Sequence, residues 1–118
     1  MHALEREFPQ LFSKNGKTTL PHGIECNQGW IPLIRELCQK LVDSGFKGNV
    51  VEVKEKFGQL RFYTTGSMTG EQRELVSEYE CASARVCEDC GQPGKITTVK
   101  GWPQTLCEEC RRKKNETP

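Results

Sequence analysis

The sequence feature that most constrains this chain is a pair of Cys-x-x-Cys motifs. Cys87 and Cys90 form the first motif, Cys107 and Cys110 form the second, and 16 residues separate the two. A two-residue gap lets one tight turn present both sulfurs to one ion, and Zn²⁺ favours a tetrahedron of such ligands. Gly91 follows the first motif directly and lets the backbone turn back towards the sulfurs. The spacing therefore predicts one structural Zn²⁺ held by these four cysteines.

Four unliganded cysteines, two disulfides and a redox-active dithiol are the competing interpretations of the two motifs. The N-terminal sequence has no basic region followed by an apolar stretch, so we expect no signal peptide and a cytoplasmic location, where thiols stay reduced. A redox-active motif normally lies in a thioredoxin-like unit, which the sequence does not predict. Four cysteines also saturate zinc and leave no position for water. The site is therefore expected to be scaffold, not catalyst.

The length of the chain makes such a site important for stability. The chain has 118 residues, 35% of them hydrophobic and 28% charged, which suits one domain with a modest core. No apolar run approaches the roughly 20 residues of a membrane span, so we expect no membrane partner. Zinc ligation can contribute about 10 kcal/mol to folding, and a domain of this size has a net stability of about 5–15 kcal/mol.

Residues 30–44 have the pattern of an amphipathic helix. Pro32 fits its first turn, and Gly45 fits its end. The residues at helical spacing on its apolar face are Ile34, Leu37, Cys38 and Leu41. Ahead of it, residues 4–12 predict a short helix, limited by a proline, and residues 13–29 predict a loop.

Residues 49–65 predict a β-hairpin with its turn at residues 56–59. On the first strand Val51 and Val53 are predicted to share a face, and on the second strand Leu60 and Phe62 do the same. A two-stranded hairpin is marginal alone, so we expect the helix, together with another strand or the zinc module, to cover its apolar face.

A second helix is predicted from Thr69 to about Arg85. Thr69 and Gln72 have the spacing of a capping box. The apolar residues that recur on one face of this helix are Leu75, Tyr79, Ala82 and Val86. We expect the helix to run straight into Cys87 and to act as a stiff connector.

These elements together predict an α+β fold. A helix–hairpin–helix domain spans residues 1–85, a four-cysteine module packed on it spans 86–114, and residues 115–118 are a polar tail. Residues 95–99 are strand-like. A helix from Cys107 onwards would make the module resemble a treble clef, and its absence would indicate a zinc ribbon.

Charge and motif content argue for a binding protein that is not an enzyme. Residues 1–85 carry equal numbers of basic and acidic side chains, and residues 86–118 carry one more basic than acidic. Nucleic-acid-binding domains usually show a clear basic excess. No catalytic arrangement, phosphate loop or small-molecule substrate site is evident. His22 and Cys26 could form half of a second metal site, for which the sequence supplies no other half.

Several segments, taken in order, resemble an uncharacterised family of small proteins from bacteria and their phages. They are Phe8-Pro9-Gln10-Leu11-Phe12, Gly23-Ile24-Glu25-Cys26 with Gly29-Trp30, Leu33-Ile34, Leu37-Cys38, the hairpin from Val53 to Tyr63, and the Cys87–Cys110 module. The resemblance spans most of the chain, its hairpin motif is specific, and residues 14–23 match less well. It implies an accessory factor that binds a host macromolecule, and it implies no catalytic residues.

The leading hypothesis is a zinc-stabilised binding module, encoded by a phage or mobile element, that binds and modulates a host protein in the host cytoplasm. The alternative is a regulatory protein that binds nucleic acid through the zinc module and the basic residues 111–114. A third hypothesis is a redox or zinc-dependent sensor. The candidate partner-binding residues are Arg61, Tyr63, Trp102, Arg111 and Arg112.

Overall fold

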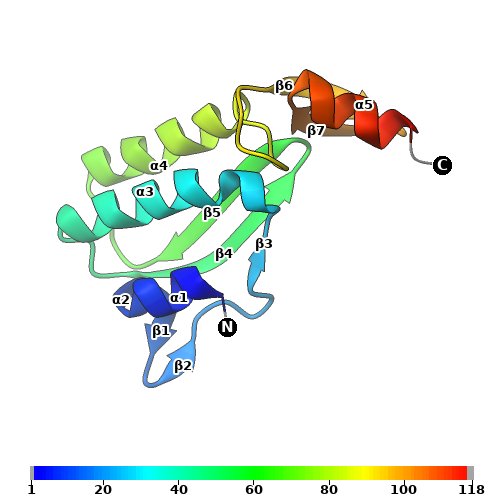
Figure 1. Cartoon of the computed structure of the whole chain (residues 1–118). Coiled ribbons are helices and arrows are strands. Elements are labelled where there is room, and N and C mark those ends of the chain that lie inside the picture. The colour runs from blue at the N-terminus through cyan, green and yellow to red at the C-terminus, as the bar shows by residue number, and fades with distance from the viewer. Residues whose placement is uncertain (1, 117–118) are drawn as a thin grey trace.

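The computed structural model describes residues 2–116, which form an elongated molecule of 46 × 28 × 20 Å (Figure 1). Its sheet has the strand order β3-β4-β5. β4 (Asn49–Lys56) pairs antiparallel with β5 (Gln59–Thr65) and parallel with β3 (Ile24–Glu25). The predicted hairpin is therefore confirmed, and the third strand comes from the segment predicted as a loop.

The hairpin turn lies at Phe57 and Gly58. Both residues have positive φ angles, 54° and 82°, as a two-residue turn that matches the strand twist requires. A bulge in β4 shifts the register between Val50 and Glu52. Strict alternation predicted Val51 on the core face, and this is wrong, because the bulge inserts an extra residue and buries Val50 instead.

Two helices, α3 (Ile31–Asp43) and α4 (Gly70–Ser83), cover one face of the sheet (Figure 1). The predicted capping box at Thr69 is present. The buried residues of α4 are Gln72, Val76, Tyr79 and Ser83. Tyr79 belongs to the predicted face, whereas Val76 and Ser83 each follow a residue that was predicted to lie on it. The helix ends at Ser83, so the expectation that it runs straight into Cys87 is wrong. A short turn intervenes, and Val86 forms an isolated bridge with Pro93.

Side chains of α4 also occupy the outer edge of β5. Ser83 Oγ accepts a hydrogen bond from the Leu60 amide at 2.9 Å, and Glu80 Oε2 accepts one from the Phe62 amide at 2.9 Å. These are backbone donors that an edge strand would otherwise present to solvent. The helix therefore covers the face of the sheet and also occupies two of the amides on this edge.

The N-terminal segment forms two short helices instead of one. They are α1 (Ala3–Glu7) and α2 (Pro9–Phe12), and they separate because Phe8 leaves the helical conformation where the proline begins α2. Beyond them a small hairpin joins β1 (Ser13–Lys14) to β2 (Lys17–Thr18), and a 3₁₀ turn η1 covers Gln28–Trp30. The segment predicted as a loop is thus largely built into the fold.

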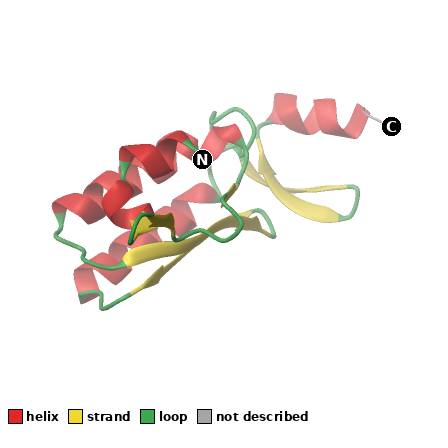
Figure 2. Ribbon diagram, turned by 90° about the horizontal axis from the view of Figure 1, so that it is seen from below, coloured by secondary structure: helices red, strands yellow, loops and turns green. Residues whose placement is uncertain are grey.

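The cysteine-rich module projects from one end of the sheet (Figure 2). It contains the antiparallel pair β6 (Lys95–Val99) and β7 (Trp102–Leu106), followed by helix α5 (Glu108–Glu116). Its buried apolar residues form a small cluster of their own, separate from the main core. Of the predicted polar tail, residues 115 and 116 end α5, and 117 and 118 lie outside the described residues. None of the helices described in residues 2–116 is long and apolar enough to cross a membrane.

Candidate metal centre

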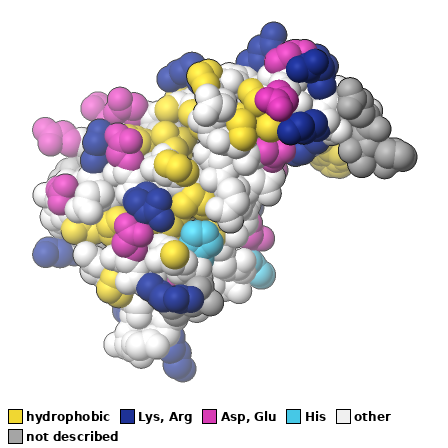
Figure 3. Space-filling view, viewed as in Figure 1, with side chains coloured by type: hydrophobic (Ala, Val, Ile, Leu, Met, Phe, Trp, Pro, Cys, Tyr) yellow, Lys and Arg dark blue, Asp and Glu magenta, His cyan; other side chains and the backbone are white. Residues whose placement is uncertain are grey.

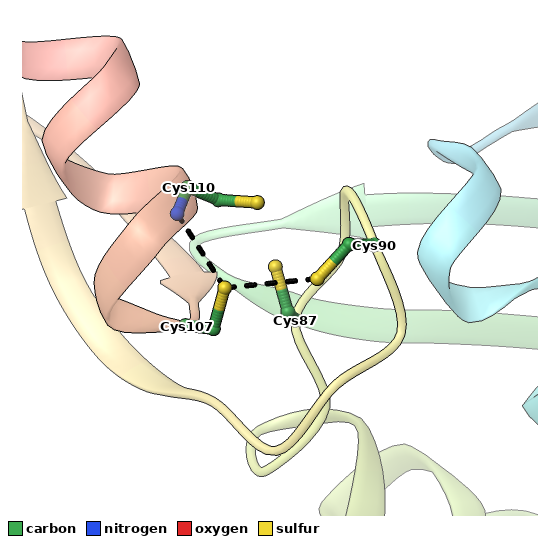
Figure 4. Close-up of side chains that lie close together, drawn as sticks. All are labelled: Cys87, Cys90, Cys107 and Cys110. Carbon is green, nitrogen blue, oxygen red and sulfur yellow. Dashed lines mark hydrogen bonds between the residues drawn. The ribbon is translucent and has the colours of Figure 1, made fainter.

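The structure brings the four cysteines of the two motifs together (Figure 4). Cys87 and Cys90 come from a turn before β6, and Cys107 and Cys110 come from the start of α5. Their four sulfurs lie within 4.8 Å of one another, and the sulfurs of Cys90 and Cys107 are 3.6 Å apart. Within residues 2–116 this is the one cluster of three or more cysteine, histidine or acidic side chains that could hold a metal ion.

The donor set fits a thiolate-binding ion. A tetrahedral Zn²⁺ with bonds of about 2.3 Å places its sulfurs about 3.8 Å apart, close to the observed spacing. The first turn is shaped for this role, since the Gly91 amide donates to the Cys87 carbonyl at 2.9 Å and Gly91 has a φ of 84°. The Cys110 amide points at the Cys107 sulfur at 3.4 Å. The cluster can therefore bind one metal ion through four sulfurs.

The electrostatics favour loss of the first proton at Cys87. Burial disfavours its thiolate, but the backbone amides of Cys107, Cys90 and Asp89 outweigh burial and lower the Cys87 pKa to about 7. Burial and the neighbouring thiols raise the pKa of Cys110. An incoming metal ion must therefore displace protons from the cluster, and its affinity falls as the solution becomes more acidic.

The first cysteine turn is fixed to the main core through Gly29 and Trp30. The Gly29 amide donates to the Glu88 carbonyl at 2.9 Å, and the Trp30 indole Nε1 donates to the Val86 carbonyl at 2.8 Å. Trp30 is fully buried. A Cβ atom at position 29 would lie 2.6 Å from the Glu88 carbonyl carbon and closer still to the Cys87 carbonyl oxygen. Only glycine permits this approach of the two backbones.

The tip of the β4–β5 hairpin is fixed to the module through Thr105. This residue is fully buried, and its hydroxyl donates to the Gly58 carbonyl. Its amide donates to Glu88 Oε2 at 3.2 Å, and its carbonyl accepts from the Glu88 amide at 2.9 Å. Hydrogen bonds at Glu88 and Thr105 thus connect three distant parts of the chain: the η1 turn, the hairpin tip and the module.

Within the described residues, the possible half-site of His22 and Cys26 gains no further ligands. His22 is exposed and Cys26 is half-buried, and neither belongs to a metal-binding cluster among the described residues. Burial raises the pKa of Cys26 to about 12, and burial does the same for Cys38 in the core. Both thiols are therefore protonated and unreactive at neutral pH. Cys81 is exposed on α4.

The candidate partner-binding residues are spread over separate surfaces. Arg61 and Tyr63 lie on β5, where Arg61 is half-buried and bonds to Gln59, and Tyr63 is exposed. Trp102 lies on β7 and is 66% exposed, and Arg111 and Arg112 lie on α5. Sequence reasoning missed Glu88, a carboxylate with only 4% of its surface exposed, whose pKa burial raises. Glu88 lies between two predicted zinc ligands, and the sequence around it does not indicate that its side chain is buried.

Comparison with family models, curated proteins and solved structures gives no match. Of the features on which the family resemblance rests, the structure shows the four-cysteine cluster.

Proposed function

We propose that the protein is a zinc-stabilised binding module in which one Zn²⁺, held by Cys87, Cys90, Cys107 and Cys110, has a structural role. The observation that supports this is the fourfold sulfur cluster, which would fill the coordination sphere and leave no open position for a reacting water. The succession of cysteine turn, hairpin and helix supports a treble-clef-like module over a zinc ribbon, because α5 begins directly after Cys107.

The partner we propose is a protein, and the activity is binding without catalysis. Charge supports a protein over nucleic acid, because acidic and basic side chains are interspersed around α5 (Figure 3). Lys114 pairs with Asp89 at 3.0 Å, Lys113 pairs with Glu109 at 3.4 Å, and Arg111 pairs with Glu108. Four thiolates on Zn²⁺ would add two further negative charges. What supports a phage or mobile-element origin, with a host protein as target, is the sequence resemblance.

Metal analysis tests the structural part of this proposal. Purified protein should contain one zinc per chain, and a strong chelator should abolish its cooperative unfolding transition. A metal-free preparation that keeps this transition in chelator would contradict the role of zinc.

Affinity capture tests the binding part. Zinc-loaded protein should enrich a specific protein from host lysate after nuclease treatment, and chelator should abolish the enrichment. A mobility-shift assay at low salt addresses the nucleic-acid alternative, for which affinity should fall steeply as salt rises. A strong shift together with no protein enriched over control beads would reverse the order of the two hypotheses.

A further inference from the structure

An open groove lies between the hairpin tip and the module. We call it the tip groove; it has a volume of about 480 Å³. Its walls include Phe57 from the hairpin turn and Trp102 from β7, which are 56% and 66% exposed. They are among the few large hydrophobic side chains described as exposed. Exposed aromatic side chains that share one hollow are a feature of many protein-binding surfaces.

Two carboxylates line the same groove. Glu88 has only 4% of its surface exposed and accepts a hydrogen bond from the Thr105 amide. Glu55 is half-buried and accepts one from the Gly58 amide at 2.7 Å. Both donors are neutral backbone groups, so neither bond neutralises a carboxylate charge. The two residues also line a second hollow of about 300 Å³, whose lining includes a third carboxylate, Glu25.

Neither lysine of the groove forms a described ion pair with Glu55 or Glu88, although the charge of Lys114 acts on Glu88 and favours its ionised form. Lys114 forms an ion pair with Asp89 at 3.0 Å and donates to Gln104 Oε1 at 2.6 Å. The ammonium group of Lys56 lies 5.9 Å from the centre of the Phe57 ring. The structure describes no ion pair between either lysine and the groove carboxylates. Among the described residues, Glu55 and Glu88 therefore lie in the tip groove without an ion-pair partner, beside two aromatic faces.

We propose that the tip groove binds a lysine or arginine side chain from a partner protein, an inference that rests on the proposed protein-binding function. The positive charge of this side chain pairs with Glu55 and Glu88, and its aliphatic stem packs on Phe57 and Trp102. An aromatic face attracts a cation as well as an apolar stem, so both kinds of wall favour this ligand. A nucleic-acid strand could stack on the aromatic rings, but its phosphates would meet the carboxylates.

The test uses nuclear magnetic resonance on the full-length, zinc-loaded chain. The chain has two tryptophans and therefore two indole N–H signals. Trp102 reports on the groove, and Trp30, bonded to the Val86 carbonyl, reports that the module is docked. The probes are an end-blocked pentapeptide with arginine at its centre and glycine and alanine elsewhere, the same peptide with citrulline, and single-stranded oligo-thymidine.

The arginine peptide should shift the Trp102 signal with millimolar affinity, and citrulline should weaken binding about tenfold. Trp102→Ala, followed through backbone amides, and Glu55→Gln, which keeps an acceptor for the Gly58 amide, should each weaken binding about fivefold or more. The controls are Ile96→Ala, which removes an exposed apolar side chain outside the groove, and Glu78→Gln on α4. Both should bind like the parent.

Equal shifts from the arginine and citrulline peptides, no Trp102 shift with either, or tighter binding of oligo-thymidine would each overturn the proposal. An unchanged Trp30 signal and one bound zinc per chain would show in the same samples that the module is intact. A failure of the groove proposal is thereby distinguished from a failure of the zinc-stabilised module.

Discussion

Replacing Gly29 with alanine tests whether the cysteine turn is held by the main core. The new Cβ would lie 2.6 Å from the Glu88 carbonyl carbon, whereas non-bonded carbon atoms prefer about 3.5–4.0 Å. The two backbones must therefore separate by about 1 Å. That movement weakens two hydrogen bonds, from the Gly29 amide to the Glu88 carbonyl and from the Trp30 indole to the Val86 carbonyl.

Each buried polar group that loses its partner costs about 1–3 kcal/mol, so we expect Gly29→Ala to lower the free energy of unfolding by about 2–4 kcal/mol. For a domain of this length the melting temperature should fall by about 10 °C. The measurement is denaturant and thermal unfolding of zinc-loaded protein, followed by tryptophan fluorescence and accompanied by metal analysis.

Gly70→Ala is the matched control. A Cβ atom there meets nothing within 4 Å, and the position is the first residue of α4, so we expect unchanged or slightly raised stability. The reasoning is refuted if Gly29→Ala retains one zinc per chain and unfolds within about 0.5 kcal/mol of the parent protein.

Three further outcomes are expected. With zinc bound, a thiol reagent at pH 8 should modify Cys81 rapidly and the other six cysteines slowly. Chelation should make the four cysteines of the cluster react rapidly as well. Several rapidly reacting thiols before chelation would contradict a zinc-filled cluster. Thr105→Val should lower the free energy of unfolding by about 1–3 kcal/mol, because the Gly58 carbonyl loses its hydroxyl donor. The same change at half-buried Thr97 should lower it less. Equal losses in denaturant titrations would be evidence against this hydrogen bond. Burial raises the Cys38 pKa from its usual 9.0 to about 12, so the contribution of this thiol to stability should be complete below pH 9 and decline as the pH rises towards 12. Cys38→Ala should therefore reduce the loss of unfolding free energy at alkaline pH. An unchanged dependence of unfolding free energy on pH would contradict this.

Features with a local cause could be predicted from the sequence. The Cys-x-x-Cys spacing brings two sulfurs to one turn wherever the motif occurs, and the capping box depends only on Thr69 and Gln72. The hairpin turn at Phe57 and Gly58 also follows from residues next to one another. In each case the physical interaction lies within four residues, so the pattern carries the structure.

Features that depend on distant segments could not be predicted. The bulge that buries Val50 alters a regular alternation without a local mark in the sequence. Gly29 matters because Cys87 and Glu88 approach it from almost 60 residues away. The tip groove needs Phe57 and Trp102 on one surface, and only the docking of the hairpin tip on Thr105 brings them there. Tertiary contacts of this kind leave no periodic signal.

The pairing of α4 side chains with β5 has a consequence for self-assembly. Ser83 and Glu80 occupy the outward-facing amides of Leu60 and Phe62, so an intruding strand would have to displace both side chains before it could form a ladder. Growth of stacked sheets from this edge therefore starts only in molecules whose α4 has detached. Conditions that release this helix, metal removal among them if it unfolds the chain, should therefore govern how readily the protein forms fibrils from this edge.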